Sequence, residues 1–284
     1  MLRWNRLSGL AASAVLAATL AGCESAGRVA SAPRVAVLDE DRSGSSAVNI
    51  ESLSDVVARN PGDASAYNTR GAAFARSGRY SDAIADFNKA LQIDPANAPA
   101  YTNRALAYRQ MGRSDAALAD FSRAIEADPK YGPAYIGRAN LYRVQNQFDA
   151  ALADLTQAVR LLPESAEALH ARGLVHQRMG RHREAVIDFD AAIDRNAYVA
   201  APYAARGQSL VALGQFDKAI EDFNAALNVN SRDADSWAYR GVALEKLGRR
   251  QEAIESYTRA TSIDQGNQTA RQGLGRLQGG LFRG

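Results

Sequence analysis

The sequence predicts an all-α protein built from stacked pairs of helices, and two observations support this prediction. The first is an internal repeat, because the same aromatic, glycine and alanine positions return every 34 residues, six times, between residues 64 and 267. The second is the composition. Apolar residues make up 46% of the chain while aromatic residues make up only 7%, and much of the apolar fraction is alanine, whose small side chain lets helices pack closely. A chain of 284 residues has room for one such array.

The spacing within a unit favours two helices joined by a turn. In the first unit, Tyr67, Gly71 and Phe74 fall at i, i+4 and i+7, which is one face of a helix. Gly78 follows and permits the turn that ends this helix. An apolar stripe over residues 83–90 then marks a second helix. Because one pair cannot bury its apolar face alone, stability has to come from stacking successive pairs.

These positions resemble the tetratricopeptide repeat (TPR) family. The aromatic or leucine that opens each unit stands at Tyr67, Tyr101, Tyr135, Leu169, Tyr203 and Trp237. The resemblance implies helix-turn-helix units stacked into a right-handed superhelix with a concave groove. Six units are expected, at residues 64–97, 98–131, 132–165, 166–199, 200–233 and 234–267. Residues 48–63 and 268–284 are expected to form an N-terminal capping helix and a C-terminal capping helix with a tail, which gives about fourteen helices.

Two departures from the repeat lead to expectations of their own. A proline closes each of the first three units, but Ala197, Ser231 and Gln265 stand in its place in the last three. Because proline cannot continue a helix, we expect softer unit boundaries after residue 195. Asn146 replaces the turn glycine of the third unit, and asparagine tolerates the left-handed conformation that the turn requires.

A column of arginines is paired in sequence with a column of aspartates. Every unit carries an arginine before its small residue, and the first five carry an aspartate sixteen residues later: Arg70, Arg104, Arg138, Arg172, Arg206 and Arg240, with Asp86, Asp120, Asp154, Asp188 and Asp222. The arginines could bind an anionic ligand or form structural ion pairs with the aspartates. Repetition in every unit favours the structural interpretation, because a binding site rarely needs identical groups along a whole solenoid. Arg240 faces Ser256 instead of an acid.

The resemblance also implies which residues of each first helix face the groove. Carried over by position, they are Asn68, Arg76, Thr102, Arg109, Asn140, Arg143, His170, Gln177, Arg178, Gln208, Val211 and Val242. The first four units contribute basic and amide side chains and the last two mostly apolar ones. A matching ligand would carry acidic residues at one end and a small hydrophobic anchor at the other. Arg109 and Arg143 are expected to face solvent, and the lysine–asparagine clamp of chaperone-adaptor members is not reproduced.

The first 22 residues are typical of a secretory signal. A short segment with two arginines precedes an apolar stretch of about 15 residues, which is shorter than a membrane-spanning helix. The stretch ends in Leu20, Ala21, Gly22 and Cys23, which resembles the bacterial lipoprotein box. This resemblance implies cleavage before Cys23 and attachment of lipid, including a palmitate-type chain, to the cysteine.

Residues 23–47 are predicted to form the lipidated cysteine and a flexible tether, because serine, alanine, glycine and charged residues dominate this stretch. The expected location is the cell envelope, with the protein anchored by lipid and facing the periplasm. Glu24 follows the cysteine. In lipoproteins of this kind an aspartate there favours the inner membrane, so its absence favours the outer membrane.

Composition argues against several other classes. Removing residues 1–22 takes away two arginines and no acid, which leaves 32 basic and 31 acidic groups, a net charge of +1. A nucleic-acid binder would normally concentrate a basic excess on one face. The single cysteine rules out an internal disulfide and a cysteine-based metal site. The three histidines are six residues apart, unlike the i, i+4 pairs that bind metals on helices. No catalytic motif is found, so neither an enzyme nor a cofactor is expected.

The sequence therefore favours a membrane-anchored adaptor that captures a peptide or helix of an envelope protein in its groove. It resembles periplasmic TPR lipoproteins that recruit peptidoglycan hydrolases and proteases. The alternative is a pilot lipoprotein for the assembly of an outer-membrane secretin or pilus component. An enzyme or metal-binding protein is a third hypothesis, with no residue to support it. Association into a homodimer is left open.

Overall fold

The computed structural model describes residues 45–279 and, within that range, consists of fourteen α-helices joined by short turns. Their bounds are α1 Ser45–Arg59, α2 Ala64–Arg76, α3 Tyr80–Ile93, α4 Ala98–Gln110, α5 Ser114–Ala127, α6 Gly132–Val144, α7 Phe148–Leu161, α8 Ala166–Arg178, α9 His182–Arg195, α10 Ala200–Ala212, α11 Phe216–Val229, α12 Ala234–Lys246, α13 Arg250–Ile263 and α14 Gln268–Gly279. The all-α TPR fold class is confirmed. The predicted signal, Cys23 and nearly all of the tether lie outside the described residues, as does the end of the C-terminal tail. None of the described helices is long and apolar enough to cross a membrane.

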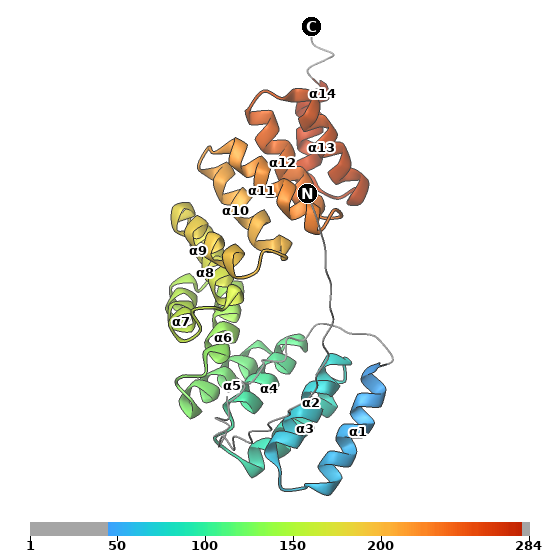
Figure 1. The fold of residues 1–284 in the computed structure, drawn as a ribbon, viewed down its shortest axis with the longest axis vertical. Coiled ribbons are helices and arrows are strands. Elements are labelled where there is room, and N and C mark those ends of the chain that lie inside the picture. Colours follow the sequence, from blue (N-terminus) through green and yellow to red (C-terminus); the bar gives the residue numbers. More distant parts are fainter. Residues whose placement is uncertain (1–44, 280–284) are drawn as a thin grey trace, which may run out of the picture. The chain divides into compact units, whose positions relative to one another are not determined.

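Helices α2 to α13 form six pairs, which we call units one to six, each with a first or A helix (even-numbered) and a second or B helix (odd-numbered). Every helix packs against the next one in the chain, as Figure 1 shows from α1 (blue) to α14 (red). The backbone of each A helix also comes close to that of the A helix of the following unit, whereas the backbones of no two B helices of the described chain come equally close. Successive units therefore lie closest together along the A helices, and we call this side the A-helix face.

The core repeats with the same 34-residue period. One large side chain of each B helix is completely buried, at Phe87, Phe121, Leu155, Phe189, Phe223 and Tyr257. The alanines four residues before and three residues after each of these are also fully buried. At Gly71 an added methyl group would lie only 2.7 Å from the Phe87 ring. The small residue of the A helix therefore makes room for the large residue of the B helix.

The turn between the A and B helices depends on one residue in a left-handed conformation. Gly78 has a φ of 77°, and the equivalent glycines of units two, four, five and six lie between 73° and 74°. Asn146 takes this position in unit three with a φ of 61°, as predicted. A β-branched residue would be strained here, which explains the choice of glycine and asparagine.

The expectation of softer boundaries after residue 195 is wrong, because the B helices of all six units end at the same repeat position. In the last three units an asparagine or aspartate side chain closes the turn instead of proline. The side-chain oxygens of Asn196, Asn230 and Asp264 accept hydrogen bonds from the backbone N–H two residues later, at 3.1, 3.2 and 2.8 Å. Asp94 and Asp128 do the same beside the prolines of units one and two. The Asx turn is sufficient to end these helices without proline.

The two end helices continue the repeat. Ser54 of α1 lies one 34-residue period before Asn88 of α3. The Ser54 hydroxyl accepts a hydrogen bond from Arg70 at 3.4 Å, and the Asn88 amide oxygen accepts the equivalent bond from Arg104. Helix α1 therefore acts as the B helix of an incomplete unit. At the other end, Leu274 and Leu277 of α14 pack against the apolar core of unit six, which agrees with the predicted C-terminal capping helix.

Candidate functional site

The structure places all twelve predicted groove residues on A helices. Asn68 and Arg76 lie on α2, Thr102 and Arg109 on α4, Asn140 and Arg143 on α6, His170, Gln177 and Arg178 on α8, Gln208 and Val211 on α10, and Val242 on α12. Because neighbouring A helices contact one another, these side chains come from one continuous row of helices. They do not contribute equally to its surface.

Three of the twelve have a structural role. Thr102 is buried, with 1% of its surface exposed, so its prediction as a ligand contact is wrong. The Gln177 amide donates to the Ala205 carbonyl at 3.0 Å and to the Ser209 hydroxyl at 3.1 Å, which ties unit four to unit five. Asn68 accepts from the Asn103 amide at 3.0 Å across units one and two. Gln177 and Asn68 remain half-buried, but these bonds limit what they can offer a ligand.

Arg109 and Arg143 differ from the prediction that both face solvent, because both are half-buried. Burial lowers the pKa of each guanidinium. The Nε of Arg143 is buried and has no hydrogen-bond partner among the described residues. The sequence could assign these arginines to a face of the protein, but it could not show how far their side chains are buried there.

Three cationic or basic side chains of units three and four influence one another. The charge of Arg178 adds to burial in lowering the pKa of Arg143. Burial, and secondly the charge of Arg143, lowers the pKa of His170 to about 4, so the imidazole is neutral at neutral pH. His170 also packs against Phe189, with ring centroids 5.7 Å apart. We call Arg109, Arg143 and Arg178 the arginine group, and none of them forms an ion pair within residues 45–279.

A carboxylate that the sequence reasoning missed lies opposite this group. Glu167 belongs to unit four, and its charge acts on the pKa of Arg109 in unit two. Desolvation raises the pKa of Glu167 although its side chain reaches solvent, while the charge of Arg109 opposes the rise. Glu167 is therefore exposed at the surface, yet it has enough protein nearby for desolvation to act on its carboxylate. Residues 58 positions apart approach here, which no local sequence signal could show.

The apolar end of the predicted groove is only partly available. Val211 and Val242 are half-buried and pack against the core of units five and six. Gln208 and Asn140 are half-buried, and the structure gives neither a side-chain hydrogen bond within the described residues. The A-helix face thus combines a cationic region in units two to four with a smaller mixed surface in units five and six.

The arginine column is structural, as predicted. In each of the first five units the arginine binds its aspartate through two parallel hydrogen bonds of 2.6 to 2.9 Å. In unit six Arg240 donates to the Ser256 hydroxyl at 2.6 Å. These guanidinium groups are committed to the fold and are not available for an anionic ligand. We call them the arginine ladder.

The ladder also connects neighbouring units. The Nη1 of Arg104 donates to Asn88 of the preceding B helix at 2.5 Å, and that of Arg138 donates to Ser122 at 3.1 Å. Arg206 reaches Asp190 in the same way. Each of these arginines therefore links two B helices whose backbones do not come close to each other.

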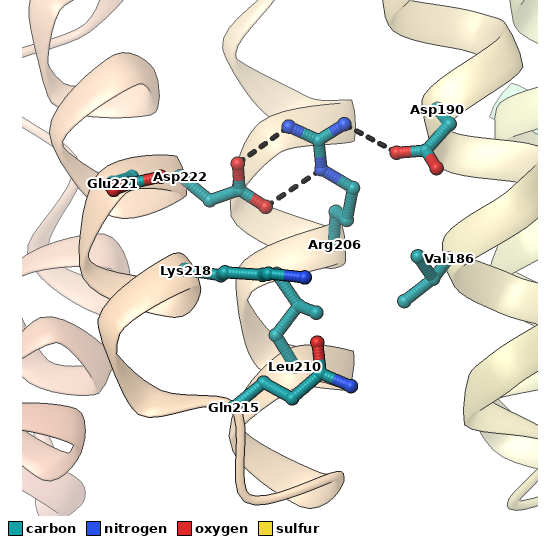
Figure 2. A pocket seen from close by; sticks show the side chains of 8 residues that line it. All are labelled: Val186, Asp190, Arg206, Leu210, Gln215, Lys218, Glu221 and Asp222. Atoms are coloured by element: carbon teal, nitrogen blue, oxygen red, sulfur yellow. Dashed lines mark hydrogen bonds and ion pairs between the residues drawn. The ribbon is translucent and has the colours of Figure 1, made fainter.

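A hollow of about 290 Å³ lies between α9, α10 and α11, and none of the twelve predicted groove residues lines it. Val186 and Leu210 form its apolar wall and Arg206 its upper boundary (Figure 2). A signal in the sequence could have indicated it, because Leu210 occupies a position where units one to three have an aromatic residue.

Comparison with known proteins agrees with this architecture. Models of the TPR repeat match residues 71–112 and 139–180, and models of the tetratricopeptide repeat match residues 98–131, 166–198 and 204–268. Together these matches cover more than half of the chain, which therefore belongs to the TPR family. TPR proteins are generally scaffolds for protein–protein interaction, and the A-helix face is the surface this fold offers. No match was found among curated proteins.

Several solved structures share the fold. The Cut9–Hcn1 hetero-tetramer of the APC/C has a TM-score of 0.69 and 20% identity over 81% of this chain, which spans 46% of that one. The pilF protein of Pseudomonas aeruginosa has a TM-score of 0.68 and 18% identity, covering 76% of this chain and 97% of its own. PilW, a widely conserved type IV pilus biogenesis factor, has a TM-score of 0.67 and 18% identity, covering 74% and 98%. At these identities the likeness establishes the fold alone.

Within residues 45–279, no three histidine, cysteine, aspartate or glutamate side chains lie close enough together to hold a metal ion. The chemistry that the A-helix face offers is ionic and hydrogen-bonding recognition by arginine. Guanidinium groups match the geometry of carboxylates.

Proposed function

We propose that this protein is a membrane-anchored adaptor of the bacterial cell envelope that binds an extended peptide or a helix of an envelope protein on its A-helix face. The arginine group would bind acidic side chains of that segment. The mixed surface of units five and six would hold a small apolar residue. A lipid on Cys23 would keep the adaptor at the membrane, facing the periplasm and preferentially at the outer membrane. A peptidoglycan hydrolase or protease is the kind of partner this arrangement suits.

One observation carries the proposal: the three cations of the arginine group have no ion pair in the described chain, and two of them are half-buried. The arginine ladder shows how this sequence treats arginines that serve the fold, since each ladder arginine has a hydrogen-bonding partner. Arginines left unpaired in a partly desolvated place favour a partner that supplies the carboxylates.

The second candidate is a pilot lipoprotein for a secretin or pilus system. The likeness to pilF and to the type IV pilus biogenesis factor PilW, each matched over nearly its whole length, supports it. Both functions use the same fold and differ in the partner. Crosslinking in intact cells, followed by mass spectrometry of the captured proteins, distinguishes them: a hydrolase or protease supports the adaptor, and a secretin or pilin supports the pilot.

Replacing Arg109 and Arg143 together with alanine is expected to weaken binding of the crosslinked partner about tenfold, because two charge-assisted contacts are lost. Binding to the unchanged protein should also weaken as salt is added, since the charge of Arg178, which is exposed, is screened within about 8–10 Å at ordinary ionic strength. Affinity is measured with purified partner at two salt concentrations, and thermal unfolding is followed in parallel.

The matched control is the pair Arg160→Ala and Arg183→Ala, which removes the same charge from exposed positions on the B helices α7 and α9. It should leave affinity within about twofold. Equal loss in both double variants would show a general effect of net charge. Unchanged affinity in the Arg109 and Arg143 variant would move the binding surface away from the A-helix face.

Cys23→Ser is expected to abolish labelling with a palmitate analogue and to release the protein from the membrane fraction. The reason is chemical, because the serine hydroxyl is a much weaker nucleophile than the cysteine thiol for lipid transfer. Labelling in growing cells and membrane fractionation measure the two effects. Undiminished labelling of the serine variant would contradict the proposed anchor and leave the A-helix face as a separate question.

A further inference from the structure

The cleft between units four and five is bounded by a guanidinium group on one side and by apolar side chains on another. Figure 2 shows the Arg206 guanidinium at its upper side, held by Asp222 of α11 on one side and by Asp190 of α9 on the other. Val186 and Leu210 lie below the guanidinium, and Lys218 extends across from α11. The volume of about 290 Å³ is that of roughly ten water molecules, which is room for one large side chain.

Units one and two show what can occupy this space. In units one and two the ladder arginine has an aromatic ring on each side, three residues before it and four residues after it. Arg70 lies 5.7 Å from the Tyr67 centroid and 5.8 Å from that of Phe74. Arg104 lies 5.5 and 6.0 Å from the rings at the same two positions. In units one and two the guanidinium therefore lies between two rings.

Unit five keeps the first ring and lacks the second. Arg206 lies 5.8 Å from the Tyr203 centroid, but the position four residues later is Leu210. The opposite wall is also smaller, because Val186 replaces the isoleucine or leucine of every other unit junction. One side of the Arg206 guanidinium therefore borders the cleft instead of a ring.

Unit five also lacks the arginine that lies over the second ring in units one and two. In units one and two an arginine at the turn lies over the second ring, with Arg79 4.4 Å from the Phe74 centroid and Arg113 4.5 Å from that of Tyr108. Unit six, which also has a leucine at the ring position, keeps an arginine at the turn, Arg249, which pairs with Glu252 at 2.6 Å. The corresponding residue of unit five is Gln215, which forms no such pair in the described chain. The cleft is therefore open because unit five and its junction with unit four differ from units one and two at three positions, Val186, Leu210 and Gln215.

We propose that this cleft receives an aromatic side chain of a protein partner, which stacks on Arg206 in the place that Phe74 and Tyr108 take in their own units. The lining carries three carboxylates, Asp190, Glu221 and Asp222, against two cations, Arg206 and Lys218. Its net charge is therefore negative, and a basic residue next to the partner's aromatic residue complements it. This site is separate from the A-helix face and does not depend on the arginine group.

The test uses the full-length protein with methyl groups labelled for NMR and two short peptides, acetyl-Tyr-Lys-amide and acetyl-Leu-Lys-amide. The tyrosine peptide is expected to shift the Val186 and Leu210 methyl signals with an affinity about fivefold higher than the leucine peptide, which is the size of a cation–π contact at a partly exposed site. Equal affinity would overturn the proposal by showing an apolar hollow without preference for a ring. Absence of any shift would overturn it as well.

Two variants close the cleft in different ways. Leu210→Tyr supplies the missing ring from the chain itself and should raise the thermal midpoint by about 2 °C while abolishing binding of the tyrosine peptide. Gln215→Arg restores the arginine at the turn without touching the core and should weaken binding at least about threefold. Arg183→Ala, on the same helix as Val186 but outside the cleft lining, is the control and should leave binding unchanged. Peptide shifts that persist in both cleft variants would show that the peptide binds elsewhere and would overturn the proposal.

Discussion

Replacing Asp120 with alanine is expected to lower the free energy of unfolding by about 3 kcal/mol, because it removes one half of the most deeply buried pair in the ladder. Asp120 accepts from Arg104 at 2.6 and 2.8 Å, and only 2% of its side chain and 12% of that of Arg104 are exposed. Burial alone would lower the pKa of Arg104, but the hydrogen bonds and charge of Asp120 outweigh it and raise that pKa. Without Asp120 the guanidinium stays charged in a place that solvates it poorly.

Asp190→Ala provides a matched control in the same ladder. This carboxylate also binds a ladder arginine, Arg206, but 51% of its side chain is exposed and Asp222 remains to hold the same guanidinium. Its loss is expected to cost less than about 1 kcal/mol. Urea unfolding of the two variants gives the comparison. Equal midpoints for both would show that burial does not set the strength of these pairs.

The ladder also shows how far sequence reasoning reaches. The pairing of each arginine with the aspartate sixteen residues later follows from sequence spacing, because both residues recur in register. The additional bond from Arg104 to Asn88 does not follow, since it depends on how one unit is placed on the preceding one. The prediction of softer boundaries after residue 195 failed for a related reason: it considered proline alone and overlooked the side chains of Asn196, Asn230 and Asp264, which close the turns.

The candidate site was predicted less completely than the fold. The resemblance to the family placed Arg109 and Arg143 on the first helices of their units, where the structure has them, but burial depends on neighbours from other units, such as Glu167. Thr102 was assigned to the same face and is buried, because neighbouring A helices lie close enough to cover a short side chain. The leucine at position 210 could be noticed in the sequence, yet only the structure shows that the side chains around Leu210 do not fill the space.

Phe121→Ala is expected to have the largest effect of any single substitution discussed, about 4 kcal/mol, because it leaves a cavity at a junction of two units. Phe121 is fully buried on α5 and packs against Ala105 of its own unit and Leu141 of the next. In a stacked array each unit is stable only through its neighbours. Urea unfolding measures the loss, and Val144→Ala, whose side chain is 69% exposed, should change stability by no more than about 0.5 kcal/mol.

Gly137 allows the origin of that loss to be tested. A methyl group added there would lie 2.2 Å from the Cε1 of Phe121, so the ring rests directly on the backbone of α6. Gly137→Ala should therefore destabilise the unchanged protein by about 1–3 kcal/mol through overpacking. In the Phe121→Ala background the same methyl group has space, and alanine is the better helix former by about 1 kcal/mol, so the substitution should become neutral or stabilising. A double-mutant cycle measures this coupling. Additive effects of the two substitutions would mean that the ring and the helix backbone do not support each other, and that Phe121 stabilises the protein only within its own unit.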